Sequence, residues 1–478
     1  MNKYRYEEIS TEIALNITEG RLKPGHKLPS VRSLKQQYHA GLSTINKAYE
    51  LLIILGLVEC VPKSGYYVAL PKASFIHPPI PLPGQKRLRD ELFRSNLLAI
   101  TARINPSHRQ ALSEFNVAAP DDLFIPQKMI LRNMQEVIKE SGTKILRYYP
   151  SNGSEPLKEQ ITKHSALNHG TFDADGLIIT DGALQAFYIA LASVTSPGDA
   201  VAVESPCVYS MLQVMNTLKL KIVEIPVLEP EGFDLNFLAE TLTTIPIKAI
   251  ALTPNFHNPT GFLMSDENKW RLLEIAKSRD IPIIENDVYG DLNFGDHRPG
   301  NISSMDDTGL VMTFSSFSKT LASGIRLGWL FTGRFFKAAE QVKFSLGSTV
   351  APVYQETMLK ILSTSSYERH IRSFRMKLAS QCYQTMELIS THFPANTLIS
   401  TPKGGYSIWL KMERNIDMAK FHDHCEEIGV RFTPGYTFSY SKAFEQYFRI
   451  VFAVKYTPYR ENVLKQAGLW AGNSIIRE

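Results

Sequence analysis

Cysteine and long apolar runs are what this sequence lacks most clearly. Its 478 residues include only four cysteines, Cys60, Cys207, Cys382 and Cys425, which are scattered without metal-ligand spacing. Neither a zinc site nor a disulfide framework is therefore indicated, and we expect no metal. No apolar run approaches the ~18 residues needed to span a bilayer. The N-terminus MNKYRYEEIS is too polar for a signal peptide, so we expect no membrane partner and take the cytoplasm as the default compartment.

Aspartate is absent from the first 72 residues. That stretch holds ten Lys or Arg against six Glu, a balance of +4, whereas the whole chain carries only +5. The composition of the whole chain, with 44% apolar and 21% charged residues, is that of an ordinary globular protein. The length predicts two or three domains. A small basic unit on a nearly neutral body indicates a polyanionic partner for the first unit only.

The first 70 residues are typical of a winged helix-turn-helix. Apolar spacing predicts helices over 6–19, 31–38 and 44–55, with Ser30 and Ser43 as N-caps of the second and third. A tight turn joins the last two helices. Two short strands, 57–61 and 66–70, flank Pro62-Lys63-Ser64-Gly65 and predict a β-hairpin with a basic tip.

The segment KLPSVRSL…LSTINKAYELLIILGLVECVPKSGYYV resembles the DNA-binding domain of GntR-type repressors, and the resemblance covers residues 1–70. It implies that double-stranded DNA is contacted by Arg32, Ser43, Thr44, Asn46, Lys63 and Gly65. Residues at the start of a recognition helix meet bases, while hydroxyls and lysines meet phosphates. Such repressors often carry Arg where this chain has Asn46, and Asn suits bidentate reading of adenine. A winged helix used for protein contacts remains the alternative.

The remaining chain divides into a linker and an α/β domain. Five prolines lie within 71–84, and we treat 71–112 as a linker that is stiff where it is Pro-rich, with a possible helix over 90–101. Five apolar runs alternate with helical stretches over 113–478, which predicts a parallel sheet covered by helices. The runs are 176–180, 200–204, 248–252, 281–285 and 310–314. A smaller α+β lobe is expected from about residue 335, with strands in 403–412 and 447–454.

One lysine stands out at the end of the run 310–314, in the sequence SSFSKTLASGIRLG. Burial there would lower the pKa of Lys319 and favour the neutral amine, the form that attacks an aldehyde. Ser316, Ser318 and Arg326 could hold a phosphate dianion beside it. A lysine nucleophile beside a phosphate cradle indicates pyridoxal 5'-phosphate held as a Schiff base. A surface lysine in a Ser-rich turn is the alternative.

Other polar residues follow the remaining strands in order. Asn258 lies in an Asn-Pro-Thr-Gly turn, Tyr289 follows the run 281–285, and Gly182 and Ala183 join a strand to a helix. Arg449 lies in the C-terminal lobe. Each signal alone is weak, but ligands bind where the strands of open α/β sheets end, and a helix N-terminus is a ready anion site.

Residues 113–470 resemble the fold-type I aminotransferases, especially the aminoadipate and kynurenine branch. The resemblance implies that Lys319 forms the Schiff base, that Asn258 and Tyr289 bond the ring oxygen, and that Arg449 pairs with an amino acid carboxylate. It also implies that Ser316, Ser318, Arg326, Gly182 and Ala183 hold the phosphate. Tyr148 matches a tyrosine that reaches the phosphate of the neighbouring subunit's cofactor.

Two positions depart from that branch. The aspartate that bonds the pyridine nitrogen is replaced by Asn286, followed by Asp287, and a shift that lets Asp287 serve is left open. Successive side chains of a strand point to opposite faces, so the two should not both face the ring. The tyrosine that stacks on the ring is replaced by Val208, with Tyr209 one place late. Both changes disfavour fast transamination.

The whole chain resembles the MocR/GabR class of transcription regulators. The expected fold is multidomain: a winged helix-turn-helix (α+β), then an α/β fold-type I transferase domain with a smaller C-terminal α+β lobe. The resemblance implies a homodimer that exchanges DNA-binding domains. The leading hypothesis is a regulator that senses an amino acid, an amine or a B6 vitamer through Lys319. The alternatives are a working aminotransferase with an attached DNA-binding domain, and a regulator whose cofactor site is vestigial.

Overall fold

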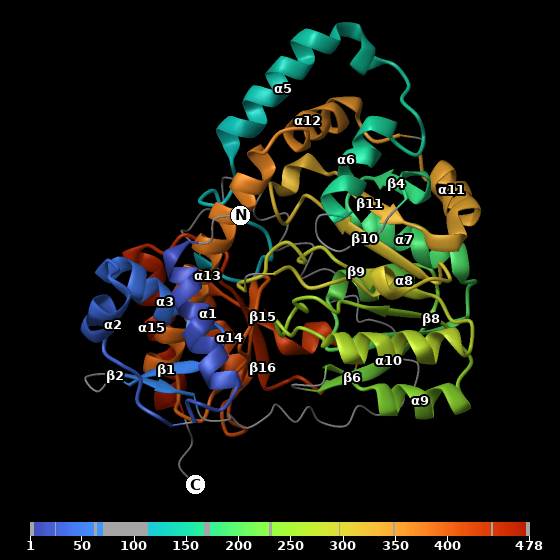
Figure 1. Ribbon diagram of the computed structural model, residues 1–478. Helices are drawn as coiled ribbons and strands as arrows, with labels where there is room; N and C mark the ends of the chain where they lie inside the picture. Colours follow the sequence, from blue (N-terminus) through green and yellow to red (C-terminus); the bar gives the residue numbers. More distant parts are fainter. Residues whose placement is uncertain are drawn as a thin grey trace.

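The chain folds into a small N-terminal domain, a large α/β body and a smaller lobe between them (Figure 1). The computed structural model describes residues 4–23, 25–61, 65–69, 113–166, 173–228, 232–295, 297–347, 349–440 and 443–474. The expected linker over 71–112, with its possible helix at 90–101, and the expected DNA contact by Lys63 lie outside these residues.

The N-terminal domain has the winged helix-turn-helix expected from the sequence. Its elements are α1 (Arg5–Thr18), α2 (Val31–Tyr38), α3 (Leu42–Ile54) and the antiparallel strands β1 (Val58–Val61) and β2 (Gly65–Val68). The Ser30 hydroxyl accepts a hydrogen bond from the Ser33 amide (3.2 Å), which confirms the predicted cap of α2. The predicted cap at Ser43 is wrong, because α3 begins at Leu42 and Gly41 takes the extended N-cap conformation.

A mixed sheet of eight strands among the described residues forms the centre of the body. Its order is β4 (Leu177–Thr180), β11 (Gly328–Phe331), β10 (Val311–Ser316), β9 (Ile283–Asn286), β8 (Ile247–Leu252), β5 (Ala200–Ser205), β6 (Lys221–Leu228) and β7 (Gly232–Phe233). The strands from β10 to β6 run parallel, as expected. Strand β11 runs antiparallel to both of its neighbours, and β7 runs antiparallel to β6. The sheet is therefore not wholly parallel.

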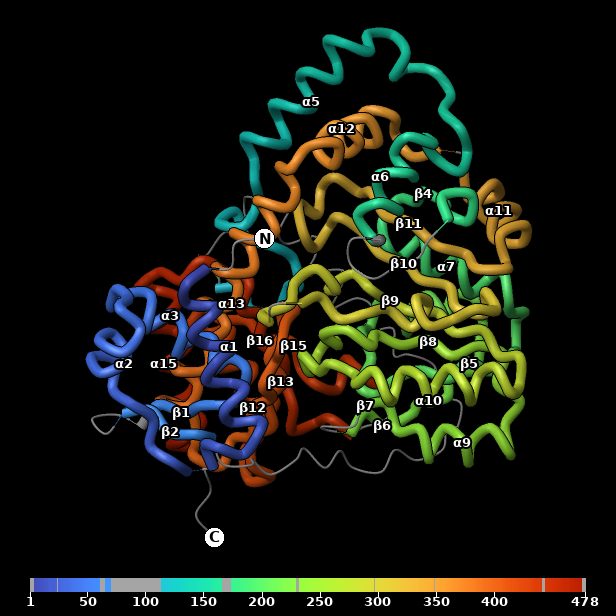
Figure 2. The backbone as a smooth tube through the Cα atoms, viewed as in Figure 1, coloured from blue at the N-terminus to red at the C-terminus, as the bar shows by residue number. Residues whose placement is uncertain are grey.

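Helices cover both faces of this sheet, as the tube in Figure 2 shows. Side-chain alternation explains why: Val201 and Val203 pack on one face with α7 and α8, whereas Ala200 and Ala202 pack on the other with α9 and α10. The helices of the body are α5 (Gln127–Ser141), α6 (Glu155–Ala166), α7 (Ala183–Val194), α8 (Tyr209–Thr217), α9 (Leu235–Thr244), α10 (Asp266–Lys277), α11 (Phe336–Ser345) and α12 (Pro352–Leu362). Short 3-10 segments lie at Gly142–Leu146, Ala174–Gly176, Ile302–Met305, Ser323–Ile325 and Gly333–Phe335.

The smaller lobe is an antiparallel sheet packed with three helices. The sheet order is β12 (Leu398–Ile399), β13 (Ser407–Lys411), β16 (Tyr447–Val451) and β15 (Thr433–Pro434), and β14 (Val430–Arg431) pairs with β3 (Ser113–Glu114). The helices are α13 (Ser366–His392), α14 (Met418–Glu427) and α15 (Pro458–Asn473), with a 3-10 segment at Gly435–Phe438. We expected this lobe from about residue 335. Helix α11 instead packs on α7, and α12 packs on α5 and α6, so the lobe begins with α13.

Among the described residues, the longest helices contain no stretch apolar enough to cross a bilayer.

Candidate cofactor site and DNA-binding face

Lys319 follows the carboxyl end of β10, where the parallel strands of the large sheet end together. Its Nζ donates a hydrogen bond to the backbone oxygen of Ala118, in the segment that leads from β3 into the body. The Tyr406 hydroxyl, from the smaller lobe, donates to the backbone oxygen of Lys319. The side chain of Lys319 is half-buried. The lysine thus follows a strand of the body and is held by two residues, Ala118 and Tyr406, that pack with the smaller lobe.

An anion cradle lies at the N-terminus of α7. Gly182 has φ +79°, and a Cβ at this position would stand 2.7 Å from a guanidinium nitrogen of Arg326. Arg326 donates to the Asp181 backbone oxygen (2.9 Å) and so lies across the start of α7. The Ser318 hydroxyl is buried, and no described residue forms a hydrogen bond with it. A buried hydroxyl normally has a partner, so this hydroxyl, a guanidinium and the amides at a helix N-terminus together fit a phosphate group.

Asn258, Tyr289 and Arg449 form one hydrogen-bonded chain. The Asn258 amide donates to the Tyr289 hydroxyl (3.4 Å), and Arg449 donates to Asn258 Oδ1 (3.0 Å). Burial raises the pKa of Tyr289 to about 12, although Arg449 and the Asn258 hydrogen bond act in the opposite direction. Tyr289 therefore stays protonated at neutral pH and can donate a hydrogen bond to an anionic oxygen.

Arg449 is a buried cation, only 2% exposed. It donates to the backbone oxygen of Asn116 and to the Thr433 hydroxyl (2.9 Å), and its guanidinium lies 5.1 Å from the centre of the Phe438 ring. Burial lowers its pKa, and its Nε has no hydrogen-bond partner among the described residues. A buried cation that pairs with no carboxylate in the described part of the chain fits a ligand that brings one.

Asn286 and Asp287 point to opposite faces of the sheet. Asn286 lies on the face of α8, where its amide nitrogen donates to Thr253 Oγ1 (3.3 Å) and stands 3.7 Å from Met211 Sδ. Asp287 forms an ion pair with Arg298 and accepts from Asn255 (3.2 Å). The carboxylate of Asp287 is thus already paired on the other face, away from α8.

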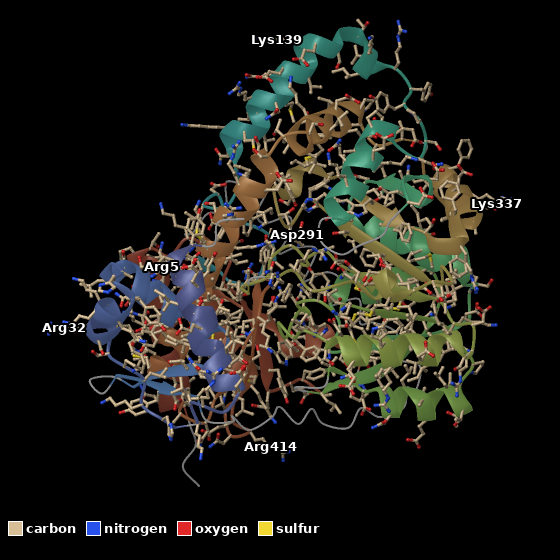
Figure 3. All side chains as sticks on the ribbon, in the orientation of Figure 1. Arg5, Arg32, Lys139, Asp291, Lys337 and Arg414 are labelled. Carbon is tan, nitrogen blue, oxygen red and sulfur yellow. The ribbon has the colours of Figure 1, made fainter. Side chains whose placement is uncertain are left out.

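Most of the expected DNA-contacting residues in the described part of the N-terminal domain are exposed. Arg32 on α2 is exposed and lies at the outer edge of the molecule (Figure 3). Ser43 and Asn46 on α3 are exposed, Thr44 is half-buried, and Gly65 begins the second strand of the wing with φ +120°. Lys27, which the sequence reasoning missed, lies beside this strand, with its ammonium 5.6 Å from the Tyr67 ring.

Two family models match the chain. The model for bacterial regulatory proteins of the gntR family matches residues 5–68, and the model for aminotransferases of class I and II matches residues 115–465. The Escherichia coli protein named uncharacterized HTH-type transcriptional regulator YjiR is 33% identical over 97% of this chain and 98% of its own length. YdcR of the same organism, named likewise, is 31% identical over the same shares. This chain is a MocR-type transcriptional regulator.

The fold of the aminotransferase-like domain of this MocR-type regulator has solved counterparts. A Pyrococcus horikoshii kynurenine aminotransferase, solved in complex with PMP, is similar at TM-score 0.73 and 24% identity, over 82% of this chain and 96% of that protein. A Thermus thermophilus α-aminoadipate aminotransferase gives TM-score 0.72 at 21% identity. The expected multidomain fold is confirmed. The aminotransferase family also confirms pyridoxal 5'-phosphate as the cofactor, and the gntR family confirms DNA as a partner.

The remaining predicted residues of the MocR-type regulator are not all at this site. Tyr148 is 93% exposed and turns away from the rest of its own chain. Val208 precedes α8, and Tyr209 begins it. Ser316 ends β10 and is buried.

Sequence reasoning missed several residues that shape the site. Asn116 and Ala118 contribute backbone oxygens from a segment about 200 residues before Lys319, so no local pattern reveals them. Behind Asn286, the Glu204 carboxylate accepts from both the amide and the hydroxyl of Thr253 (2.8 Å each). The same Thr253 hydroxyl accepts from Asn286, so this chain of hydrogen bonds fixes the amide of Asn286.

Proposed function

We propose that this MocR-type regulator binds pyridoxal 5'-phosphate at Lys319 and uses it to sense an amino acid, an amine or a B6 vitamer. The observation that carries the proposal is the buried Ser318 hydroxyl, which has no hydrogen-bond partner among the described residues, in a loop whose Phe317 amide donates to the Leu327 oxygen beside Arg326, the residue that lies against Gly182. When bound, the cofactor supplies an aldehyde for Lys319 and an electron-withdrawing ring.

In this proposal, different residues bind the phosphate, the ring and the carboxylate of the effector. Ser316, Ser318, Arg326 and the amides of Gly182 and Ala183 hold the phosphate. Asn258 and Tyr289 orient the ring through its oxygen, since Tyr289 retains its proton at neutral pH. Arg449 offers a desolvated cation to the carboxylate of an amino acid. Asn286, and not Asp287, faces the ring nitrogen, because Asp287 is paired with Arg298 on the other face.

We further infer that the regulator works as a homodimer in the cytoplasm. Helix α5 and the segment after it leave Leu131, Ile138, Leu146 and Tyr148 exposed, an apolar set that a second copy would cover. Tyr148 would then reach the phosphate of the neighbouring subunit. In the structure the DNA-binding domain packs on α13 of its own chain, and exchange would place the neighbour's domain on the same surface.

The first test is chemical. The purified protein should be yellow, and borohydride should attach the cofactor irreversibly to the peptide that contains Lys319, as read by mass spectrometry. Lys319→Ala should abolish attachment. A protein that stays colourless after incubation with pyridoxal 5'-phosphate would contradict the proposal.

The second test is genetic. Genomic sites bound by the native protein, by Lys319→Ala and by Arg32→Ala should be mapped in parallel. We expect Arg32→Ala to lose sites generally, whereas Lys319→Ala should change occupancy only in response to the effector. Genes beside the bound sites would identify the class of effector. Identical occupancy for the native protein and Lys319→Ala under every growth condition would argue against sensing.

A further inference from the structure

Helix α13 reaches from the cofactor site to the DNA-binding domain. It runs without interruption from Ser366 to His392, and 27 residues at 1.5 Å each span about 40 Å. In Figure 1 it passes from the large body to the blue N-terminal domain, and α3 contacts it. A rigid element with one end at each site can carry a displacement between them.

The first turns of α13 hold the backbone around Lys319. The Tyr367 hydroxyl donates to Thr320 Oγ1 (3.0 Å), and His370 Nε2 donates to the Thr320 backbone oxygen (2.7 Å). Phe374 stacks parallel to Tyr406, with ring centres 6.3 Å apart, and Tyr406 donates to the Lys319 backbone oxygen. Tyr367 and His370 therefore bind Thr320 directly, and Phe374 contacts Lys319 through Tyr406.

The same end of α13 is tied to the body behind the site. Arg375 donates to the backbone oxygen of Asp291 (2.6 Å), and the Tyr367 hydroxyl also lies 3.2 Å from an Asp291 carboxylate oxygen. Asp291 lies near the centre of the molecule (Figure 3) and also pairs with His164 and Arg298. A shift of the Lys319 backbone must either carry α13 with it or break these buried hydrogen bonds.

The part of α13 beyond its first two turns packs with the DNA-binding domain. Ile54 of α3 is 1% exposed and belongs to the same apolar cluster as Phe374, Leu378 and Cys382 of α13, with Leu51 packed at its edge. Glu50 of α3 and Cys60 of the wing lie close enough to Glu387 for that carboxylate to raise the pKa of each, after the larger effect of burial. Arg32 and Asn46 remain exposed while the domain packs on α13, so this packing leaves the residues expected to contact DNA accessible.

We propose that α13 couples the state of Lys319 to the docking of the DNA-binding domain, with Tyr367 and His370 as positioning residues. The inference rests on the proposed function, because it requires a cofactor at Lys319. A ligand that takes the cofactor's aldehyde away from the lysine alters the hold on the Lys319–Thr320 backbone. The change in these hydrogen bonds moves α13, and with it the α13 surface against which Leu51 and Ile54 pack.

Cys60 is a built-in reporter of this docking. It is exposed, whereas the three other cysteines of the chain are buried. Its labelling by iodoacetamide, followed by mass spectrometry, therefore measures the accessibility of the wing next to α13, and Cys60→Ser confirms the assignment. The probe ligand is aminooxyacetate, which removes the aldehyde from Lys319 and presents a carboxylate to Arg449. Its binding is seen independently as a change in visible absorbance.

The full-length protein loaded with pyridoxal 5'-phosphate should change its Cys60 labelling rate by about fivefold or more when aminooxyacetate is added, the lower range of coupling between sites. Tyr367→Phe combined with His370→Leu should keep the absorbance change and lose the labelling change. Arg369→Gln, on an exposed position of the same turn, is the matched control and should respond like the native protein. Leu51→Ser should label fast with or without the probe.

The outcomes separate the two proposals. An absorbance change with no change in Cys60 labelling in the native protein would overturn the coupling and leave the proposed function standing. If the Tyr367→Phe/His370→Leu protein shows the same labelling response as the native protein, these two residues do not have the proposed roles. If the Leu51→Ser protein is labelled like the native one, Leu51 does not hold the DNA-binding domain against α13. No absorbance change at all would overturn the proposed function, and this inference with it.

Discussion

At the scale of single residues, the chemistry that we propose depends most on Asn286. Its amide is held from two sides, since its nitrogen donates to Thr253 and its oxygen accepts from the Val288 amide (3.3 Å). An amide can donate a hydrogen bond to a neutral ring nitrogen, but it carries no charge with which to keep that nitrogen protonated. The ring then withdraws electrons weakly, which suits binding and sensing more than rapid turnover.

Asn286→Asp should therefore speed conversion of the cofactor to its amine form by about tenfold or more, equivalent to ~1.4 kcal/mol of barrier. The measurement is single-turnover absorbance with a panel of amino acids. Asp287→Asn is the matched control and should not accelerate the reaction, because its side chain lies on the other face. Rapid turnover by the native protein, at about 1–10³ per second, would instead favour a working aminotransferase.

The sequence allowed the candidate residues to be picked but not their partners. Lys319 and Asn258 each follow a recognisable run, Arg449 lies inside one, and strand alternation alone predicted that Asn286 and Asp287 diverge. The backbone oxygens of Asn116 and Ala118 could not be found, because any residue offers such an atom. The ion pair of Asp287 with Arg298 depends on a loop whose path no periodicity specifies.

At the scale of elements, helix caps and apolar periodicity predicted helices and strands whose bounds depend on neighbouring residues in the sequence. Helix α2 has the predicted bounds because Ser30 caps it, and the five apolar runs became buried strands. Strand β11 was missed, because its four residues follow the lysine loop without alternation. Gly328 begins it where a Cβ would stand 2.7 Å from the Gly182 carbonyl carbon and the Ser315 oxygen, a closeness that only the fold reveals.

The capped start of α2 places Arg32 at the outer edge of the DNA-binding domain. We expect Arg32→Ala to weaken DNA binding at every salt concentration and to reduce the salt dependence by about one phosphate contact. The cofactor's absorbance should be unaffected. Arg414→Ala, at an exposed arginine of the smaller lobe, is the control. Equal dissociation constants for native protein and Arg32→Ala across salt would rule out the docking proposed for this helix.

We expect His422 of helix α14 to make the smaller lobe less stable in acid. Burial lowers the pKa of His422 to about 4, and its Nε2 is buried without a partner among the described residues. A depressed folded-state pKa means that the neutral form is favoured by folding. This stability is complete above the unfolded pKa of about 6.5, and it is lost as the pH falls toward 4.

Between pH 7 and pH 5 the native protein should lose at most about 2 kcal/mol from this residue, and His422→Leu should not lose it. Thermal unfolding at the two pH values measures the difference. His297→Leu, at an exposed histidine, is the control and should keep the native pH response. If His422→Leu shows the same loss as the native protein, the buried imidazole is not its source.

At the scale of the whole molecule, one chain contains a basic DNA-binding domain and a nearly neutral cofactor domain, and α3 of the first contacts α13 of the second. Tyr148, which we propose completes a cofactor site, is 93% exposed in the single chain. If each site borrows this tyrosine from a second copy, dimerisation completes the sensor. Tyr148→Ala should then weaken binding of pyridoxal 5'-phosphate by roughly tenfold or more, the cost of losing a hydrogen bond to a charged group.

Hybrid dimers distinguish a borrowed tyrosine from one that acts within its own chain. One chain carries Tyr148→Ala and the other carries Lys319→Ala, and the two are co-expressed with different purification tags. If Tyr148 crosses to the neighbour, one site of each hybrid combines a native Lys319 with a native Tyr148 and binds one cofactor with native affinity. If Tyr148 acts in its own chain, no site is intact, and affinity stays as weak as in the Tyr148→Ala homodimer. Titration by absorbance reads both affinity and stoichiometry, so native affinity at one cofactor per hybrid supports exchange across the dimer, and weak binding refutes it.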